Sequence, residues 1–128
     1  MGNLDAKRDW GHARDYVDGM WRILQHPEPD DFVLATGLTT SVRDFTQKAF
    51  AVAGIFLKWE GSGASEIGRD TESGSVRVRI DPAYYRPTEV DFLLGDASKA
   101  REKLGWVPKY KLDQLIEEMV LSDLGRPV

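Results

Sequence analysis

The sequence predicts an α/β fold in which helices mix with short, separated strands. Amphipathic periodicity near each end of the chain predicts helices, and short β-prone apolar runs between them predict strands. No regular strand–helix alternation supports a complete parallel sheet. At 128 residues the chain lies within the usual range for one domain. We therefore expect an α/β unit whose sheet is completed by strands outside this segment.

The first predicted helix covers residues 12–25. Its apolar residues recur at three- and four-residue spacing: Ala13, Tyr16, Val17, Met20, Trp21 and Leu24. Pro27 and Pro29 end it. The apolar run at 32–35, bounded by acidic residues and Gly37, predicts a buried strand.

A second helix is predicted to begin at Ser41, with Asp44 in place of the Glu that a capping box prefers. Gly54 supplies a left-handed stop for this helix. Residues 55–59 are apolar and β-prone, which predicts a strand. Residues 61–74 are rich in Gly, Ser and charge, which predicts a mobile loop.

The last third of the sequence predicts one strand and two helices. A half-exposed strand is predicted where arginines alternate with Val76, Val78 and Ile80. Asp96 is expected to cap a short helix that ends near Leu104-Gly105. A final amphipathic helix, ending at Leu124-Gly125, is predicted by the spacing of Leu112, Leu115, Ile116, Met119 and Val120.

The composition excludes several classes of function. The chain has no cysteine, which excludes disulfides, thiolate nucleophiles and zinc–thiolate sites. Its net charge of −4 argues against a general nucleic-acid binder, which usually shows a basic face. The first residues lack the apolar run of a signal peptide, and no apolar stretch approaches the roughly 18 residues of a membrane span. We therefore expect a cytoplasmic protein without nucleic-acid or membrane partners.

Several motifs of nucleotide enzymes are missing from the sequence. No Gly-x-Gly-x-x-Gly follows a predicted strand, and no Tyr-x-x-x-Lys pair occurs. Residues 63–70 have the glycine spacing of a P-loop but lack its Lys and its Ser or Thr. His12 and His26 are too few for a metal cluster without carboxylate help, and we expect His12 to support the loop before the first helix. We therefore expect no catalytic residue, no bound cofactor and no metal in this chain alone.

Arg8 is the first candidate binding residue. Its guanidinium fork matches two phosphate oxygens, which predicts a phosphate clamp. The alternative is a surface arginine paired with Asp5 or Asp9.

Arg86 and Glu89 form a second candidate pair. Pro87 biases Arg86 toward an extended backbone that presents its side chain outward. The Glu89 carboxylate can accept two hydrogen bonds from the hydroxyls of a ribose. The alternative is an ion pair between Arg86 and Glu89 within one loop.

The remaining aromatic and basic residues are expected to have structural roles. We expect the four tryptophans to lie in the core rather than stack on a ligand: Trp10, Trp21, Trp59 and Trp106. Arg77 and Arg79 are expected to form a solvated strand face, with a secondary phosphate contact as the alternative.

The opening of the chain resembles a signature of GDP-mannose 4,6-dehydratases, which are extended short-chain dehydrogenases. The resemblance is carried by Gly2-Asn3-Leu4-Asp5-Ala6-Lys7-Arg8-Asp9-Trp10-Gly11-His12-Ala13 and by Arg86-Pro87-Thr88-Glu89-Val90. The resemblance also includes residues 32–37, 41–43 and 81–85. Residues 94–100 and 103–108 continue it in the right order, and these two segments are shared widely among extended short-chain enzymes of nucleotide sugars.

The resemblance implies the C-terminal part of an NAD(P)-binding Rossmann-like enzyme, with the cofactor half missing. Residues 1–37 would complete the Rossmann-like domain, and residues 38–128 would form the C-terminal substrate-binding domain, with its mixed helices and short strands. The missing N-terminal Rossmann part would then be a partner of this chain. A strand edge and an apolar helix face would be uncovered without it, so we expect the isolated chain to be unstable or to self-associate.

The resemblance also implies a lyase activity. The family converts GDP-mannose to GDP-4-keto-6-deoxymannose, in the biosynthesis of GDP-fucose and other deoxyhexoses. Tightly held NADP takes hydride from the sugar C4 and returns it at C6, after water is lost. The tyrosine, lysine, threonine and glutamate of the acid–base steps belong upstream, so this chain should be inactive alone. The resemblance assigns Arg8 and Arg86 to the diphosphate and Glu89 to the ribose, in a homo-oligomeric enzyme.

Three other functions stay open on the sequence. The chain could be a non-catalytic module that binds a GDP-sugar, or a degenerate piece that serves as an interaction surface. It could also belong to an epimerase or dehydratase of another nucleotide sugar.

Overall fold

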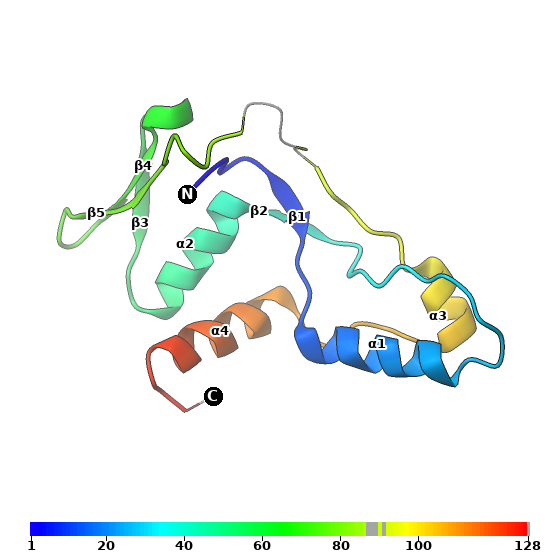
Figure 1. Ribbon diagram of the computed structural model, residues 1–128. Helices are drawn as coiled ribbons and strands as arrows, with labels where there is room; N and C mark the ends of the chain where they lie inside the picture. The colour runs from blue at the N-terminus through cyan, green and yellow to red at the C-terminus, as the bar shows by residue number, and fades with distance from the viewer. Residues whose placement is uncertain (87–89, 91, 128) are drawn as a thin grey trace.

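The computed structural model describes residues 1–86, 90 and 92–127 (Figure 1). Its helices and strands follow one another in the order β1 (Lys7–Asp9), α1 (Ala13–Gln25), β2 (Thr39–Ser41), α2 (Val42–Val52), β3 (Leu57–Glu60), the 3-10 turn η1 (Gly63–Ser65), β4 (Ile67–Asp70), β5 (Val76–Arg79), α3 (Ser98–Leu104) and α4 (Leu112–Asp123).

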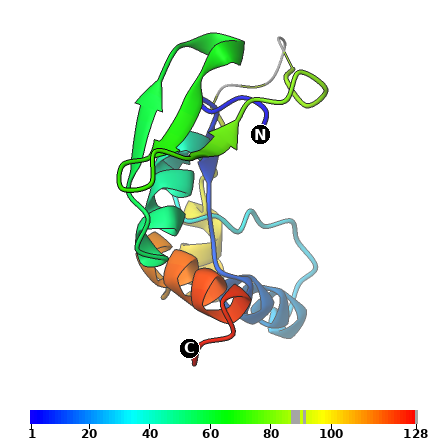
Figure 2. The same cartoon turned by 90° about the vertical axis from the view of Figure 1, so that its left-hand side faces the viewer.

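The strands form two small antiparallel sheets. In the three-stranded sheet, β4 lies between β3 and β5, and Lys58 pairs with Arg69 in its register. In the second sheet β1 pairs with β2, with Arg8 opposite Thr40. β2 continues directly into α2, so the short sheet connects the N-terminal segment to the helix that covers the larger sheet (Figure 2).

The helices separate into two groups along the molecule. α2 packs with α4 beside the three-stranded sheet, whereas α1 packs with α3 at the other end (Figure 1). Two connecting segments lie between these ends, and they approach β1 through residues 36–37 and 92–95. Arg8 lies on β1, beside the second of these segments.

Most predicted helices are confirmed. α1 lies within one residue of its predicted start, and α2 begins after Ser41, whose hydroxyl accepts a hydrogen bond from the Asp44 N–H. Asp96 accepts from the Ser98 N–H at the start of α3, and Gly105 ends that helix with φ +63°. α4 and the strands near 55–59 and 76–80 are also confirmed, with small shifts of their ends.

Two predictions about strands are wrong. Residues 32–35 are extended, but they pair with no strand of the described chain. A strand forms only where a neighbouring edge receives its backbone hydrogen bonds, and no described strand lies at this position. Residues 61–74 are not a loop throughout, since they contain η1 and β4. A Cβ on Gly68 would lie 3.0 Å from the Trp59 ring, so this glycine lets the ring pack onto β4.

The described core is small. Trp106 and Ile116 are its largest fully buried side chains, and much of the rest is alanine. The prediction that all four tryptophans are core residues is wrong for Trp21, whose exposed fraction is 60%. Trp21 lies on α1 with Val17, Met20 and Leu24, all of which are exposed. The apolar face of α1 is therefore uncovered in this chain.

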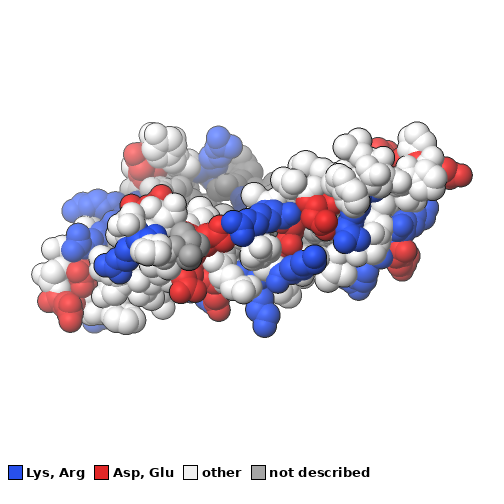
Figure 3. Space-filling view, turned by 90° about the horizontal axis from the view of Figure 1, so that it is seen from below, with Lys and Arg blue, Asp and Glu red and all other residues white. Residues whose placement is uncertain are grey.

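The solvent-accessible surface area is larger than expected for a compact domain of this mass. The chain exposes 8627 Å², whereas a compact monomer of this mass is expected to expose about 6,800 Å². Charged side chains of both signs are interspersed with uncharged residues over the face seen from below (Figure 3). Among the described helices, none has the length and apolar character needed to cross a membrane.

Candidate functional site

β1 places Arg8 beside the segment that follows Arg86. Lys7 forms a parallel bridge with Phe92, and the Leu93 N–H donates to the Lys7 carbonyl at 3.1 Å. The Arg8 guanidinium donates from Nη1 to the carbonyls of Lys7 and Val90, both at 2.8 Å. The candidate arginine of β1 is therefore bonded to the chain four residues beyond Arg86.

Arg86 lies close to the N-terminal segment. It lines a cavity of about 390 Å³ with Gly2, Asn3, Val42, Ala83 and Tyr84. A Cβ on Gly2 would lie 2.6 Å from the Tyr84 carbonyl oxygen, so only glycine permits this approach. Tyr84 thus lies against Gly2, whereas Phe92 and Leu93 contact Lys7, so the chain on each side of residues 87–89 adjoins the N-terminal segment. Glu89, the third candidate, lies outside the described residues.

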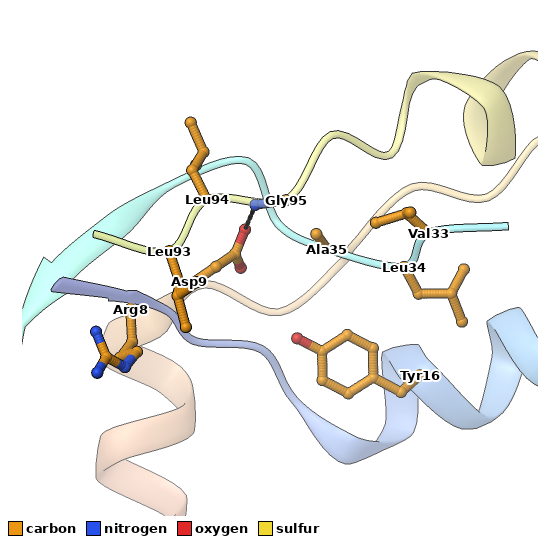
Figure 4. Close-up of a pocket in the computed structure, with 9 residues that line it drawn as sticks. All are labelled: Arg8, Asp9, Tyr16, Val33, Leu34, Ala35, Leu93, Leu94 and Gly95. Carbon is orange, nitrogen blue, oxygen red and sulfur yellow. Dashed lines mark hydrogen bonds between the residues drawn. The ribbon is translucent and has the colours of Figure 1, made fainter. Parts of the chain in front are cut away.

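Asp9 occupies the crossing of three segments. Its Oδ1 accepts from the Thr36 N–H at 2.9 Å and from the Thr36 hydroxyl at 2.5 Å. Its Oδ2 accepts from the Gly37 N–H at 2.9 Å. The same oxygen accepts from the Gly95 N–H at 3.4 Å, the hydrogen bond drawn in Figure 4. Asp9 thereby holds the end of β1 to residues 36–37 and to Gly95.

The other proposed partner of Arg8 is also bonded elsewhere. Asp5 accepts from Arg43, which binds Glu66 in a bidentate pair at 2.6 and 2.9 Å. The two carboxylates raise the pKa of the Arg43 guanidinium, with the Glu66 hydrogen bonds as the first cause. Arg43 thus ties α2 to the start of β4 and to the segment before β1.

A cavity of about 330 Å³ lies beside Asp9 (Figure 4). It is lined by Arg8, Asp9, Tyr16, Val33, Leu34, Ala35, Leu93, Leu94 and Gly95. Burial raises the pKa of the Tyr16 hydroxyl, and the Asp9 and Asp15 carboxylates raise it further. A Cβ on Gly11 would lie 2.1 Å from that hydroxyl oxygen, so this glycine leaves room for the Tyr16 side chain.

His12 has the supporting role that the sequence predicts. Its Nδ1 accepts from the Arg14 N–H at 3.0 Å and so caps α1, while its Nε2 bonds to Glu118 at 2.9 Å. This hydrogen bond lowers the pKa of the Glu118 carboxyl. His12 therefore connects the first helix to the last.

The structure places the other basic candidates away from this crossing. Arg77 and Arg79 are exposed on β5, and Arg77 approaches the Asp70 carboxylate at 3.5 Å. Their predicted solvated face is confirmed. Within the described part of the chain, no group of three His, Cys, Asp or Glu side chains is arranged to hold a metal ion.

Sequence reasoning missed Asp9 and Tyr16 as residues of the site. The position of Asp9 directly after Arg8 was the one indication of its importance, but it predicted only an ion pair with that arginine. Nothing in the sequence indicates that its carboxylate reaches residues 27, 28 and 86 positions away.

Short antiparallel strands, peripheral helices and two crossing segments define the chain as part of the fold of extended short-chain dehydrogenases and nucleotide-sugar epimerases. A UDP-glucose 4-epimerase from Thermotoga maritima, solved with UDP-glucose, superposes with a TM-score of 0.73 at 21% identity, over 98% of this chain and 34% of that one. RMD from Pseudomonas aeruginosa, complexed with NADPH, gives a TM-score of 0.69 at 19% identity, over 96% and 34%.

The sequence narrows the class further. A family model described as GDP-mannose 4,6 dehydratase matches residues 1–119, and the chain belongs to this family. The GDP-mannose 4,6 dehydratases of Cricetulus griseus and Homo sapiens are each 56% identical to it over 124 residues, which is 97% of this chain. The chain spans about a third, 33%, of the length of these relatives.

The glycine-rich run at 61–68 is not a turn between a strand and a helix. Gly63 lies in η1 and Gly68 in β4, so the run lacks the strand–turn–helix context of a dinucleotide fingerprint. The same arrangement removes the P-loop alternative, because a phosphate cradle needs a helix N-terminus after its glycine loop.

Proposed function

We propose that this chain supplies the nucleotide-sugar-binding part of a GDP-mannose 4,6-dehydratase. The complete enzyme would convert GDP-mannose to GDP-4-keto-6-deoxymannose. The single observation that carries the proposal is the attachment of the segment after Arg86 to β1, through the hydrogen bond from Arg8 to the Val90 carbonyl. Family membership supplies the substrate class.

The proposed roles follow from the chemistry of the side chains. Arg8 and Arg86 approach the diphosphate from two different segments, and two guanidinium groups offset its negative charge. Glu89 accepts hydrogen bonds from the ribose hydroxyls. All three groups bind and orient the nucleotide, and none is assigned a proton transfer.

Catalysis is assigned to residues outside this chain. The family uses NADP, and one of the fold relatives was solved with NADPH, but this chain holds no fingerprint for it. NADP would supply the transient oxidation at C4, and the chain alone would turn over no substrate. A cytoplasmic location and a homo-oligomeric assembly complete the proposal.

The division of the chain at residue 37 is part of the proposal. Residues 1–37 contain α1 with its uncovered apolar face and the unpaired extended run at 32–35. Such features are typical of pieces that complete a larger sheet. Residues 38–128 contain the three-stranded sheet with α2 and α4, which fits a separate substrate-binding domain.

The test uses a full-length chimera in which this segment replaces the matching third of the human relative. In the chimera, Arg8→Ala and Arg86→Ala should each weaken GDP binding by about 1.5–3 kcal/mol, the scale of hydrogen bonds to charged groups. Isothermal titration with GDP measures this loss, which is about ten- to hundredfold in Kd.

The matched control is Lys58→Ala, which removes one positive charge from an exposed position of β3. Its GDP affinity should equal that of the parent chimera. Unchanged affinity in both arginine variants would contradict the assignment of the diphosphate site.

A further inference from the structure

We infer that Asp9 is a positioning residue, which sets Arg8 and the segment beyond Arg86 in the geometry that binds the diphosphate. The inference rests on the proposed function and adds a residue to it. It depends on the four hydrogen bonds that converge on one carboxylate.

The donors around Asp9 require a carboxylate and no other group. Three are backbone N–H groups and one is the hydroxyl of Thr36. An ionised carboxylate offers two oxygens with about four acceptor sites and carries no proton of its own. An asparagine amide would turn its NH₂ group toward two of these donors, so even this isosteric change disrupts the crossing.

The segments that Asp9 joins are in direct contact. A Cβ on Gly95 would lie 2.2 Å from the Ala35 Cβ, a separation that no real pair of atoms keeps. The Ala35 methyl therefore lies directly against the Gly95 backbone, next to the Asp9 carboxylate, and only glycine leaves room for it.

Arg8 lies on the opposite side of the same strand. Successive side chains of a strand point to opposite faces, and Figure 4 shows Arg8 and Asp9 leaving β1 in opposite directions. Asp9 binds Gly95 from one face, while Arg8 binds the Val90 carbonyl from the other. The Leu93 N–H joins the same segment to the Lys7 carbonyl between them. Releasing Gly95 therefore moves the carbonyl that orients the Arg8 guanidinium.

The experiment is a double-mutant cycle in the full-length chimera. Asp9→Asn should weaken GDP binding about as much as Arg8→Ala does, roughly tenfold or more. In the Arg8→Ala background, Asp9→Asn should change the GDP affinity little, because the group through which it acts is gone. Asp5→Asn is the matched control: it removes the same charge from an exposed ion pair with Arg43 and should keep the parent affinity.

Melting temperatures distinguish a positioning role of Asp9 from a role in stability alone. Titrations are made well below the melting temperature of every variant. A lower Tm for Asp9→Asn with unchanged GDP affinity would overturn the inference, and so would an equal loss of affinity in both backgrounds. If Arg8→Ala itself leaves GDP binding unchanged, the proposed site fails and the inference fails with it.

A milder variant keeps the test open if Asp9→Asn does not fold. Thr36→Val preserves the shape of the side chain and removes its hydroxyl, which donates to Asp9 and accepts from the Leu38 N–H. It should weaken GDP binding about two- to tenfold, the scale of one hydrogen bond, and only when Arg8 is present. Parent affinity in this variant would contradict the inference.

Discussion

At the scale of single residues, Trp106 anchors α1 to the chain that enters α4. Its ring is 1% exposed, and its Nε1 donates to the Asp15 carbonyl at 2.8 Å. The Asp15 carboxylate in turn accepts from the N–H groups of Lys109 and Tyr110. One buried tryptophan and one buried aspartate thus fix this corner with side chains that reach about ninety residues along the sequence.

Removing the Trp106 ring should lower the free energy of unfolding more than the loss of any single hydrogen bond of this corner. Trp106→Ala is expected to lower the free energy of unfolding by about 3–5 kcal/mol, because it leaves a cavity in a small core. Trp106→Phe keeps most of the apolar volume and should cost clearly less. Urea denaturation of the full-length chimera, followed by circular dichroism, measures both. Equal losses for the two variants would show that the ring volume is not what stabilises this corner.

The candidate site shows what residue types can and cannot indicate. Arg8 and Arg86 were predicted because a guanidinium near a known signature indicates anion binding. The structure brings their segments together, and their contact with a diphosphate stays a prediction. Asp9 could not be assigned in this way, because its partners are backbone N–H groups whose position depends on the whole fold.

At the scale of elements, helices were predictable, whereas short strands were predictable only in part. The spacing of apolar residues in α1 and α4 predicts these helices from their own sequences. The caps at Ser41 and Gly105 are also local features. β3 and β5 were predicted from an apolar run and from alternating valines. β1, β2 and β4 carry neither signal, so they were missed. Residues 32–35 show the reverse error, since a β-prone run forms a strand only where another edge receives its hydrogen bonds.

The cap of α1 gives a test at this scale. His12→Ala should destabilise the protein by about 0.5–2 kcal/mol, the usual cost of losing an N-cap. It also removes the hydrogen bond to Glu118 on α4. His12→Asn retains a capping side chain and should recover most of the loss. Thermal unfolding of the chimera compares the three proteins, and equal Tm values for the Ala variant and the parent would contradict the capping role.

The loop between α1 and residue 32 is attached to α3 through a pH-dependent contact. The hydrogen bond from Lys99 to Asp30, at 2.8 Å, holds the pKa of the Asp30 carboxyl at about 2. Because the folded pKa lies below the unfolded value of 3.8, the unfolded chain binds more protons between them. This contribution to stability is therefore complete above about pH 4 and is lost as the pH falls through about 2.

A pH series of urea midpoints from pH 6 to pH 2 measures this effect. The parent chimera should lose stability steeply at the acid end, and Asp30→Asn should lose less over the same range. The Asn variant should be less stable than the parent at pH 6, where the contribution of Asp30 is complete, and the two should converge toward pH 2. The difference should be modest, because the ion pair is exposed to solvent. Parallel curves for the two proteins would show that Asp30 does not contribute to the acid dependence.

At the scale of the whole molecule, the chain exposes apolar surface that a compact protein would cover. Val17, Met20, Trp21 and Leu24 form one exposed face on α1, and Val33 of the neighbouring extended run is also exposed. Contiguous apolar patches on soluble proteins usually mark an interaction surface. The part of the relatives that this chain does not span is the proposed occupant.

The isolated chain should therefore self-associate, and the association should depend on this face. Sedimentation at increasing concentration should show species heavier than the 14.4 kDa monomer, and Trp21→Ser with Leu24→Ser should shift them toward the monomer. In the chimera the same double change should instead lower the Tm, because there it would remove buried apolar contacts. Lys58→Ala should alter neither property. A monomeric chain with a cooperative melt, together with an unchanged Tm for the double variant of the chimera, would mean that the α1 face faces solvent in the complete protein as well.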